Sequence, residues 1–441
     1  MHPLTRRDFL GKTALATLAA SSFNAPFIRS VRAGEPGAND KIRIGLIGCG
    51  GMGQGDLRCF FLNPEIDCAV VCDVDDAQIA KGLAICEEKR GKKPDTAKDF
   101  RRVLDRKDVD VVLIATPDHW HALPAVLACQ AGKDVYVEKP LAKTIDEGRA
   151  MVEAAKRHSR VVQMGSQWRS CPHIIEAAEL IRSGKLGKVS LARAWAFLDW
   201  LPSIGKVADC PPPAGVDYDL WLGPAPKRPF NPNRFHFNFR WFWDYAGGLM
   251  TDWGVHLINM AAMGLPDEAP KSVTSCGGKF ILDDDSETPD SQVTVYDFPT
   301  CQLIWENRAG LNNGLNGRPW GVEWHGTEGN IILNDTGWEL VTEPKRAKTP
   351  SQRKRSDGSD PRAPHVRNFL ACVKSRAQPV LNLDIGHRVS TLAHLGNIAY
   401  RTGQKIAWDG VKEKIVGNRD ADKLVGVKYR KPWELPYARR A

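Results

Sequence analysis

The sequence predicts an α/β protein with an N-terminal doubly wound parallel sheet, followed by an α/β domain with a large, mostly antiparallel open sheet. At 441 residues the chain exceeds the length at which a single core keeps growing, which favours two domains. Up to about residue 166, short apolar runs alternate with amphipathic segments. Beyond that point, longer alternating stretches are separated by Gly, Asp and Pro clusters, which is typical of antiparallel strands.

The first domain is expected over residues 39–165. Its apolar runs predict buried strands, and the segments between them predict helices. Strand, helix and strand at this spacing imply parallel pairing through right-handed crossovers, with helices covering both faces of the sheet. The expected strands are 41–48, 68–74, 109–116, 133–140 and 160–166, and the expected helices are 51–62, 75–89, 117–132 and 144–158.

The second domain is expected over residues 166–441. The stretch 344–364 is basic and rich in Pro and Ser, which predicts a solvated loop. Apolar residues at helical spacing before a Gly stop predict a helix over 384–402, which we expect to pack back toward the first domain. A further helix is expected at 172–184, and strands are expected at 188–197, 271–282, 291–298, 301–310 and 320–333.

Residues 1–33 have the composition of a twin-arginine export signal. Arg6 and Arg7 precede Phe9 and Leu10, and small residues near position 33 suit cleavage. The weakly apolar stretch between them is too short to span a bilayer. We therefore expect the twin-arginine export machinery as a partner and a periplasmic location for the mature chain.

Charge and cysteine content favour neither nucleic-acid binding nor a metal centre. The formal net charge is +9, but much of it lies in the signal and in 344–364, and no basic motif falls on a folded face. The 11 cysteines form no repeated C-x-x-C pairs. His119 and His121 are close in sequence but have no matched third ligand, so no metal is expected.

A glycine-rich turn follows the first predicted strand and opens the first predicted helix. Gly48, Gly50 and Gly53 stand in the order G-x-G-x-x-G, with Gly51 and Met52 between the last two. Glycines in this order permit a tight turn and a close backbone approach to a pyrophosphate at the helix N-terminus. The context predicts a Rossmann nucleotide-binding domain.

Asp73 lies at the tip of the next predicted strand. A carboxylate there can accept a hydrogen bond from the ribose 2′-hydroxyl and repels a 2′-phosphate. No Arg or Lys follows before Lys81. We therefore predict NAD as the cofactor rather than NADP.

Four motifs in the sequence occur together in one known family: "GCGGMG", "ATPDHWH" (115–121), "EKP" (138–140) and "GGLMTDWGVH" (247–256). Together and in this order they resemble the glucose-fructose oxidoreductase / inositol dehydrogenase (Gfo/Idh/MocA) family, from about residue 41 to the segment 397–410. The resemblance implies a Rossmann domain, an α/β domain whose open sheet often mediates oligomers, and a homo-oligomer, dimer or tetramer. It further implies that Lys139 is the catalytic lysine, with a Lys139–Pro140 bond that is often cis, and that Asp252 and His256 complete the site.

The strand ends carry further expected cofactor contacts, because ligands of open parallel sheets bind outside the carboxyl ends of the strands. By the resemblance, Pro117 and His121 line the nicotinamide pocket, whereas Asp118 can simply cap a helix. The full set expected to join the glycine turn is Thr116, Pro117, His121, Glu138 and Gln167.

The expected chemistry follows from residue types and spacing. Asp252 and His256 are four positions apart in a helical stretch, so both side chains lie on one face. The carboxylate can hold the imidazole tautomer while the other ring nitrogen accepts the proton of a substrate hydroxyl. Lys139 can hydrogen-bond the same oxygen and stabilise negative charge. An isolated D-x-x-x-H pair is usually a surface pair, and the surrounding motifs favour the catalytic interpretation.

The aromatic stretch 234–245 places Phe235, Phe237, Phe239, Trp241 and Trp243 on alternate positions, which predicts a strand with one aromatic face. Core packing or a subunit contact explains such a face as well as rings that stack on a sugar. By position, the further candidates for substrate contact are Trp168, Arg169 and Tyr245.

Three functions remain open at this point. The leading one is an NAD-dependent oxidoreductase acting on a secondary alcohol of a carbohydrate: a sugar, cyclitol or derivative. The second is a glycosidase that oxidises a ring hydroxyl transiently, eliminates the glycosidic substituent and needs no net redox change. The third is a non-catalytic nucleotide-bound sensor, which the presence of Lys139, Asp252 and His256 argues against. Export of a folded protein further predicts a tightly held cofactor that is recycled in the same site.

Overall fold

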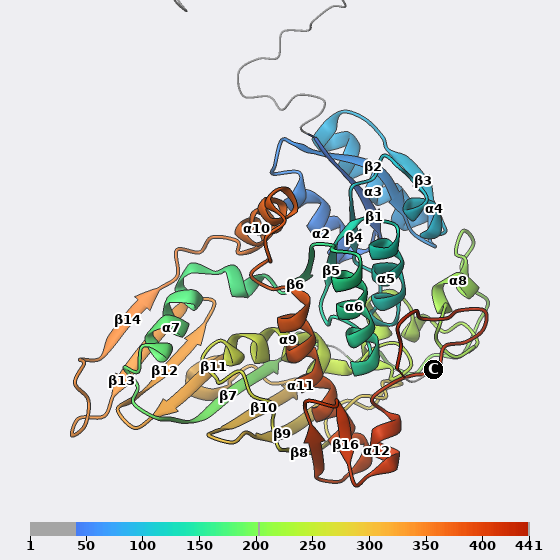
Figure 1. The fold of residues 1–441 in the computed structure, drawn as a ribbon. Helices are drawn as coiled ribbons and strands as arrows, with labels where there is room; N and C mark the ends of the chain where they lie inside the picture. The colour runs from blue at the N-terminus through green and yellow to red at the C-terminus, as the bar shows by residue number, and fades with distance from the viewer. Residues whose placement is uncertain (1–40, 202, 440–441) are drawn as a thin grey trace, which may run out of the picture. The chain divides into compact units, whose positions relative to one another are not determined.

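The computed structural model describes residues 41–201 and 203–439. From Ile42 onward the chain forms one compact unit built on two sheets (Figure 1). The expected export signal, 1–33, lies outside the described residues, as do the first residues expected for the first domain.

The N-terminal sheet has six strands in the order β3-β2-β1-β4-β5-β6, and every pairing is parallel. The chain order reverses between β1 and β4, which is the switch point where nucleotides bind in doubly wound folds. This confirms the predicted fold class. The strands are β1 (Ile42–Ile47), β2 (Ile66–Cys72), β3 (Asp95–Ala97), β4 (Val111–Ile114), β5 (Asp134–Glu138) and β6 (Val162–Gly165).

Helices connect these strands, and their termini show why they begin and end where they do. Asp75 caps α3 by accepting a hydrogen bond from the Ala77 N–H, and Gly91 ends it in the left-handed region. Thr144 caps α6: its hydroxyl accepts a hydrogen bond from the Glu147 N–H and donates one to the Glu147 carboxylate. The helices are α2 (Gly51–Phe60), α3 (Asp76–Arg90), α4 (Arg101–Leu104), α5 (Ala122–Gln130) and α6 (Ile145–Arg157).

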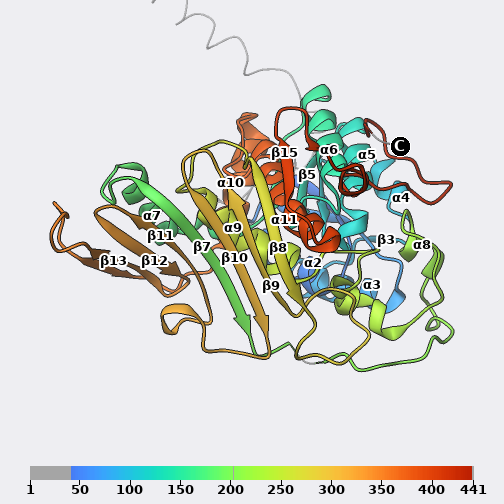
Figure 2. The ribbon, with the colours of Figure 1, turned by 90° about the horizontal axis from the view of Figure 1, so that it is seen from below.

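The C-terminal sheet has ten strands in the order β14-β13-β12-β11-β7-β10-β9-β8-β15-β16. Its pairings are antiparallel except between β7 and β10. Figure 2 shows the central strands side by side. The strands are β7 (Val189–Leu198), β8 (Ser272–Gly278), β9 (Ser291–Asp297), β10 (Gln302–Ala309), β11 (Trp320–Gly326), β12 (Gly329–Asn334), β13 (Gly337–Thr342), β14 (Gln352–Arg355), β15 (Ile406–Asp409) and β16 (Lys414–Val416).

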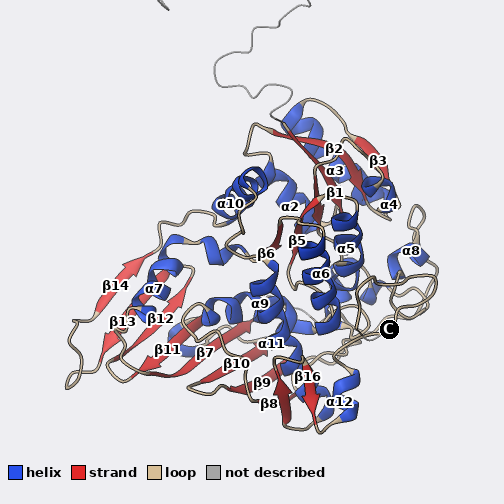
Figure 3. Ribbon diagram, viewed as in Figure 1, coloured by secondary structure: helices blue, strands red, loops and turns tan. Residues whose placement is uncertain are grey.

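Helices α7, α9 and α11 contact one face of this sheet (Figure 3). The side chains of β10 alternate between buried and more exposed positions, as expected for a sheet with one packed face. The helices of this region are α7 (Pro172–Arg182), α8 (Tyr218–Leu222), α9 (Gly248–Ala262), α10 (Arg362–Ser375), α11 (Leu383–Thr402) and α12 (Arg419–Lys423).

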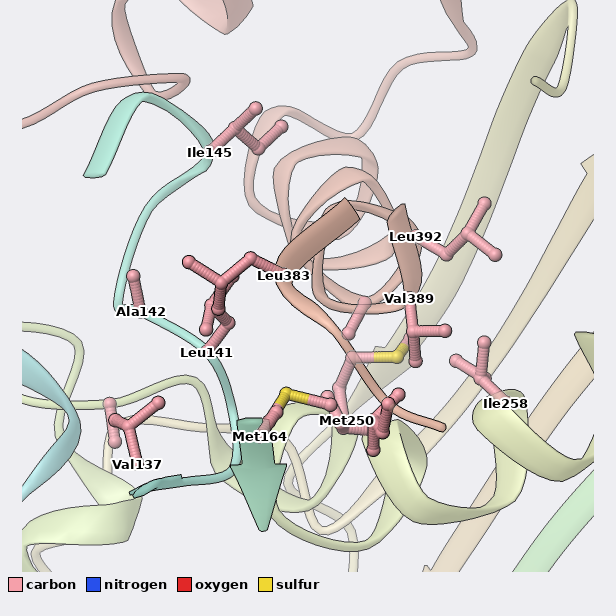
Figure 4. Packing of buried hydrophobic residues seen from close by; sticks show 14 of the residues in the cluster. Val137, Leu141, Ala142, Ile145, Met164, Met250, Ile258, Leu383, Val389 and Leu392 are labelled. Carbon is pink, nitrogen blue, oxygen red and sulfur yellow. The ribbon is translucent and has the colours of Figure 1, made fainter. Parts of the chain in front are cut away.

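Helix α11 joins the two sheets. Its apolar side chains, including Leu383 and Val389, pack with Leu141, which follows β5, with Met164 of β6 and with Met250 of α9 (Figure 4). Fully burying one such side chain contributes about 1.5–3 kcal/mol. The hydroxyl of Ser390 accepts a hydrogen bond of 3.0 Å from the Leu141 N–H. Helix α11 therefore fixes the segment that follows Lys139.

Three predicted elements need correction. The stretch 320–333 is a hairpin of β11 and β12 rather than one strand, because the alternating pattern continues through a short turn. The stretch 344–364 is not all loop, because it contains β14 and the start of α10. β14 pairs with β13 and forms the edge of the sheet, where its basic side chains discourage further strand addition.

The aromatic stretch 234–245 is not a strand. It forms two short 3₁₀ helices, η4 (Pro232–Arg234) and η5 (His236–Trp241), and His236 has a left-handed φ of 48°. Burial of aromatic rings on several sides overrides the period-two pattern. Phe239 and Trp241 are buried, whereas Phe237 is half-exposed.

Candidate active site

A cavity of about 540 Å³ opens at the carboxyl ends of β1, β4 and β5. It reaches from the glycine turn to α9, and the C-terminal part of the chain supplies part of its wall. Its volume and position match those of cofactor sites in doubly wound proteins.

The glycine turn at the start of α2 forms one end of this cavity. Gly48 has a left-handed φ of 93°, and a Cβ atom on Gly53 would lie 1.9 Å from the Gly48 carbonyl oxygen. Gly50 and Gly51 line the cavity and have open space where a side chain would stand. No side chain caps α2, so its first N–H groups can face a ligand. These features fit the pyrophosphate of NAD.

Asp73 also lines the cavity, beyond the glycine turn. Its carboxylate accepts hydrogen bonds from the Cys49 N–H at 2.7 Å and the Asp75 N–H at 3.0 Å. Burial raises its pKa, and the two N–H groups oppose that rise. The carboxylate is thus fixed in place with lone pairs left for a ribose hydroxyl.

The outer wall of the cavity comes from the segment that leads into η5. Its backbone pairs with the β2–α3 loop: the Asp217 N–H donates to the Val74 carbonyl at 2.9 Å, and the Asp76 N–H donates to the Gly215 carbonyl at 3.2 Å. On the opposite rim, the Trp120 indole N–H donates to the Trp221 carbonyl at 2.9 Å. We call residues 215–240 the roof of the cavity.

A further contact holds the roof near the ribose end. His236 Nε2 lies 2.8 Å from Asp75 Oδ2, and His236 lines the cavity. The C-terminal tail supports the other rim, because Trp433 packs edge-on against Trp120 at 4.9 Å. Segments distant in sequence therefore enclose the site.

Lys139 lies at the far end of the cavity and forms an ion pair with Asp252 of α9. Its ammonium donates to Asp252 Oδ1 and, at 3.2 Å, to the Asp252 carbonyl. The Arg240 Nε–H donates to the same Oδ1 at 3.2 Å. Burial opposes ionisation of Asp252, but the two cations hold its pKa well below the ordinary value. The Lys139–Pro140 bond is cis, as the resemblance implies.

Asp252 does not hydrogen-bond His256 as we expected, because the two cations occupy it. Instead, His256 Nδ1 lies 3.0 Å from the Ser166 hydroxyl oxygen. That oxygen accepts a hydrogen bond from the Asn259 amide at 3.2 Å, and Asn259 accepts one from Arg169 at 2.9 Å. The Ser166 hydroxyl can then donate to His256 Nδ1, which places the ring proton on Nε2.

Burial lowers the pKa of His256 to about 3, and the Lys139 ammonium adds to the effect. The imidazole is therefore neutral at neutral pH. In the Nε2–H tautomer it donates to a ligand rather than accepting a proton from one.

Two further carboxyls line the cavity near Lys139. Burial raises the pKa of Asp118 to about 7, against the opposing charges of Lys139 and Arg240. Burial likewise raises the pKa of Glu138 to about 7, and Glu138 accepts a hydrogen bond of 3.3 Å from the Lys139 N–H. A carboxyl that titrates near neutral pH is suited to proton transfer. Asp118 does not act as a helix cap: it is the first residue of the 3₁₀ helix η2 (Asp118–Trp120), and His121 holds the N-cap position of α5.

Most of the expected site residues lie in the cavity wall. They are Gly48, Gly50, Gly51, Met52, Asp73, Thr116, Pro117, Glu138, Lys139 and Asp252. Gly53 lies behind the turn, where its lack of a side chain permits the approach to Gly48.

The remaining expected residues lie elsewhere among the described residues. His121 is buried with both ring nitrogens against carbonyl oxygens, Pro140 at 2.7 Å and Thr116 at 2.9 Å, so it supports the wall without forming it. Tyr245 is fully buried against Trp221 and is a core residue rather than a substrate contact. The others outside the cavity wall are Gln167, Trp168, Arg169 and His256.

Sequence reasoning gave Asp118 no role beyond a helix cap, whereas Asp118 lines the wall. Phe237 and Phe239, for which it left core packing and stacking on a sugar open, line the wall together with His236 and Arg240. Arg240 lies over the Phe237 ring at 4.5 Å, so this aromatic stretch positions a cation. The polar residues between the aromatic ones in the stretch 234–245 were the sequence signal that could have indicated a place in the cavity wall.

Within 41–201 and 203–439, no cluster of three or more His, Cys, Asp or Glu side chains is placed to bind a metal ion. In the same ranges, no helix combines the length and the apolar character that crossing a membrane requires.

Comparison with known families assigns both sheets. A sequence profile described as an oxidoreductase family with an NAD-binding Rossmann fold (GFO_IDH_MocA) matches residues 42–166. Its companion, described as the C-terminal alpha/beta domain of an oxidoreductase family (GFO_IDH_MocA_C2), matches residues 179–302 and 340–435.

Individual relatives agree with this assignment. Levoglucosan dehydrogenase of Pseudarthrobacter phenanthrenivorans is 31% identical over 324 residues, 66% of this chain and 73% of that protein. A glycosyl hydrolase family 109 protein of Shewanella baltica is 27% identical over 206 residues, 43% of this chain. That match spans 45% of the Shewanella protein, less than half its length.

Solved structures show the same fold. Levoglucosan dehydrogenase in complex with NADH and levoglucosan superposes with a TM-score of 0.63 at 20% identity, covering 83% of this chain and 99% of that one. An aldose-aldose oxidoreductase from Caulobacter crescentus complexed with glycerol gives 0.64 at 20% identity, again covering 83% and 99%.

Proposed function

The chain belongs to the Gfo/Idh/MocA family of NAD-dependent oxidoreductases, and on this premise we propose that it oxidises a secondary alcohol of a sugar, cyclitol or related derivative. The observation that carries the proposal is the Lys139–Asp252 pair at the end of the cavity that begins with the glycine turn. It places a fixed cation where the reacting oxygen of a substrate would lie beside the nicotinamide. The relative named levoglucosan dehydrogenase supports a carbohydrate as the substrate class.

In the proposed reaction, Lys139 keeps two of its three N–H bonds on Asp252 and offers the third to the substrate oxygen. A preorganised ammonium stabilises the negative charge that develops on that oxygen as its proton leaves. NAD, when bound, supplies the acceptor for the hydrogen that leaves the carbinol carbon with its electron pair. Arg240 keeps Asp252 ionised and in place.

We assign the proton acceptor to Asp118. It lies in the cavity wall with Lys139, and its pKa of about 7 allows it to take the hydroxyl proton near neutral pH and release it afterwards. His256, with its ring proton on Nε2, is assigned to donate a hydrogen bond to the substrate.

The proposal includes export by the twin-arginine pathway and a cofactor that stays bound. A retained cofactor is supported by the roof, which lines the cavity and is held to the β2–α3 loop by the contact between His236 and Asp75 and by backbone hydrogen bonds. A retained cofactor must be regenerated in the same site, by a second substrate or by the product of the first. We also propose that copies of the chain assemble through the open face of the ten-stranded sheet.

A second candidate function is a redox-neutral glycosidase, favoured by the relatives named glycosyl hydrolase family 109 proteins. Oxidation of a ring hydroxyl to a ketone would acidify the neighbouring C–H. Loss of that proton and of the glycosidic oxygen would form a C=C bond, water would add across it, and return of the hydride to the ketone would restore the cofactor.

The deciding experiment gives purified protein a panel of sugars and aryl glycosides without added cofactor. Stoichiometric NADH formation, or reduction of a second sugar, supports the oxidoreductase. Release of the aglycone without NADH accumulation supports the glycosidase. If no compound of the panel yields NADH, a reduced second sugar or a free aglycone, both candidate functions are contradicted.

A further inference from the structure

Four tryptophans from four different segments cluster beside His256. Trp168 lies in η3 (Gln167–Ser170), Trp200 follows β7, Trp253 belongs to α9, and Trp320 begins β11. Trp168 and Trp320 stack with ring centroids 4.5 Å apart and an interplanar angle of 8°. Trp253 joins Trp168 at 6.0 Å, Trp320 at 5.8 Å and Trp200 at 6.4 Å. We call these residues the tryptophan cluster.

The cluster lies at the margin of the core. Trp168, Trp253 and Trp320 pack against the core and are partly exposed, and Trp200 is 48% exposed. By contrast, Trp195, Trp305 and Trp324 of the ten-stranded sheet are fully buried. Leaving aromatic surface in water is unfavourable, at roughly 25 cal/mol per Å² of apolar area. A group of four partly exposed tryptophans therefore indicates a surface that binds a ligand or partner.

The cluster adjoins the catalytic residues, although its rings and His256 lie just outside the wall of the cavity. Trp253 follows Asp252 on α9, and the Trp168 ring lies 5.0 Å from the His256 ring. A second ring of a substrate that reacts at the Lys139–Asp252 pair would meet the cluster on the side of His256. This proximity to the catalytic groups favours a part of the substrate over a separate ligand.

We propose that the tryptophan cluster is a subsite for a second pyranose ring, so that the substrate is a disaccharide or longer glycoside rather than a free monosaccharide. The C–H face of a pyranose is apolar and matches an aromatic ring, while its hydroxyls at the rim remain in water. This inference rests on the proposed function and narrows its substrate class.

The test uses the full chain loaded with NAD and follows tryptophan fluorescence and calorimetry during titration with glucose, galactose, cellobiose, maltose and lactose. The expected result is that at least one disaccharide binds roughly tenfold more tightly than its constituent sugar. Trp200→Ala and Trp253→Phe are each expected to reduce that advantage at least about threefold. The matched control is Phe280→Ala, which removes a 75% exposed ring outside the cluster and should keep the advantage.

Equal affinity for mono- and disaccharides in the unaltered protein would overturn the proposal, as would an advantage that persists in both tryptophan variants. A Trp200→Ala variant that changes the oligomeric mass in light scattering but keeps the advantage would make the cluster a subunit contact instead. Circular dichroism confirms that each variant is folded. If disaccharides bind through the cluster but none is turned over, the proposed function fails while the subsite stands.

Discussion

Lys139 and Asp252 form a buried ion pair that joins the segment directly after β5 to helix α9. Their side chains are 9% and 13% exposed, and Asp252 also accepts a hydrogen bond from Arg240. A pair this buried loses hydration, so it is retained only where further hydrogen bonds satisfy both charges. Here the pair connects the sheet that carries the glycine turn to α9, which packs on the second sheet, at the place where we propose that the substrate reacts.

Replacing Lys139 tests the proposed stabilisation of charge. Lys139→Met is expected to lower kcat about 100- to 1000-fold, because it removes the cation from the reacting oxygen. Bound NAD, measured by mass spectrometry of the denatured protein, should remain, since the glycine turn and Asp73 are untouched. Full turnover in the variant would contradict the mechanism.

Replacing Asp118 tests the proton acceptor. Because the pKa of Asp118 is raised to about 7, its carboxylate is lost as the pH falls through 7. The rate of alcohol oxidation should fall in that range, and Asp118→Asn should remove this acid limb and lower kcat about 100-fold or more.

Glu138→Gln is the matched comparison for Asp118, since the pKa of Glu138 is also raised to about 7. If the acid limb persists in Asp118→Asn and disappears in Glu138→Gln, the proton acceptor is Glu138 and our assignment is wrong.

Asp73→Ala tests cofactor recognition. The change removes the ribose acceptor and leaves the Cys49 and Asp75 N–H groups without their partner, so NAD affinity should fall roughly 10- to 100-fold. Calorimetric titration of protein stripped of nucleotide measures this effect. An unchanged dissociation constant would refute the assignment of Asp73.

His236→Gly tests the roof. Glycine accepts the left-handed backbone at this position, so the change removes the contact with Asp75 without adding strain. We expect bound NAD to be lost faster during dialysis, by about an order of magnitude for one charge-assisted hydrogen bond. Lys206→Ala, which removes an exposed pair with Asp283, is the control. Equal retention in both variants would show that the roof does not hold the cofactor.

Local sequence patterns predicted most strands of the first sheet, the glycine turn and helix α11, because each depends on residues that are close together in the sequence. The strands of the first sheet are buried and mostly apolar except for β3, whose residues Asp95–Ala97 are mostly polar and exposed and were not predicted as a strand. The glycine turn specifies its own geometry through Gly48 and Gly53. The fold class and one end of the cavity therefore followed from the sequence. Helix α11 was expected over 384–402 and spans Leu383–Thr402 because its apolar spacing is regular along its whole length.

Contacts between segments that are distant in the sequence could not be predicted from local patterns. The spacing of Asp252 and His256 suggested a mutual hydrogen bond, but Lys139 and Arg240 compete for the carboxylate and Ser166 takes the imidazole. The 3₁₀ turns around Phe237 likewise arise from burial on several sides, which overrides alternation. The spacing of residues along the chain does not reveal which of several possible partners forms the hydrogen bond in the folded protein.

The most direct test of the central claim, that this chain is an NAD-dependent oxidoreductase acting on a carbohydrate alcohol with a retained cofactor, is to purify it without added nucleotide and follow NADH absorbance on addition of each sugar in the panel. The account predicts copurified NAD and a single-turnover burst of NADH that a second sugar discharges. Protein that carries no nucleotide, binds none when NAD is supplied and oxidises no sugar would contradict it.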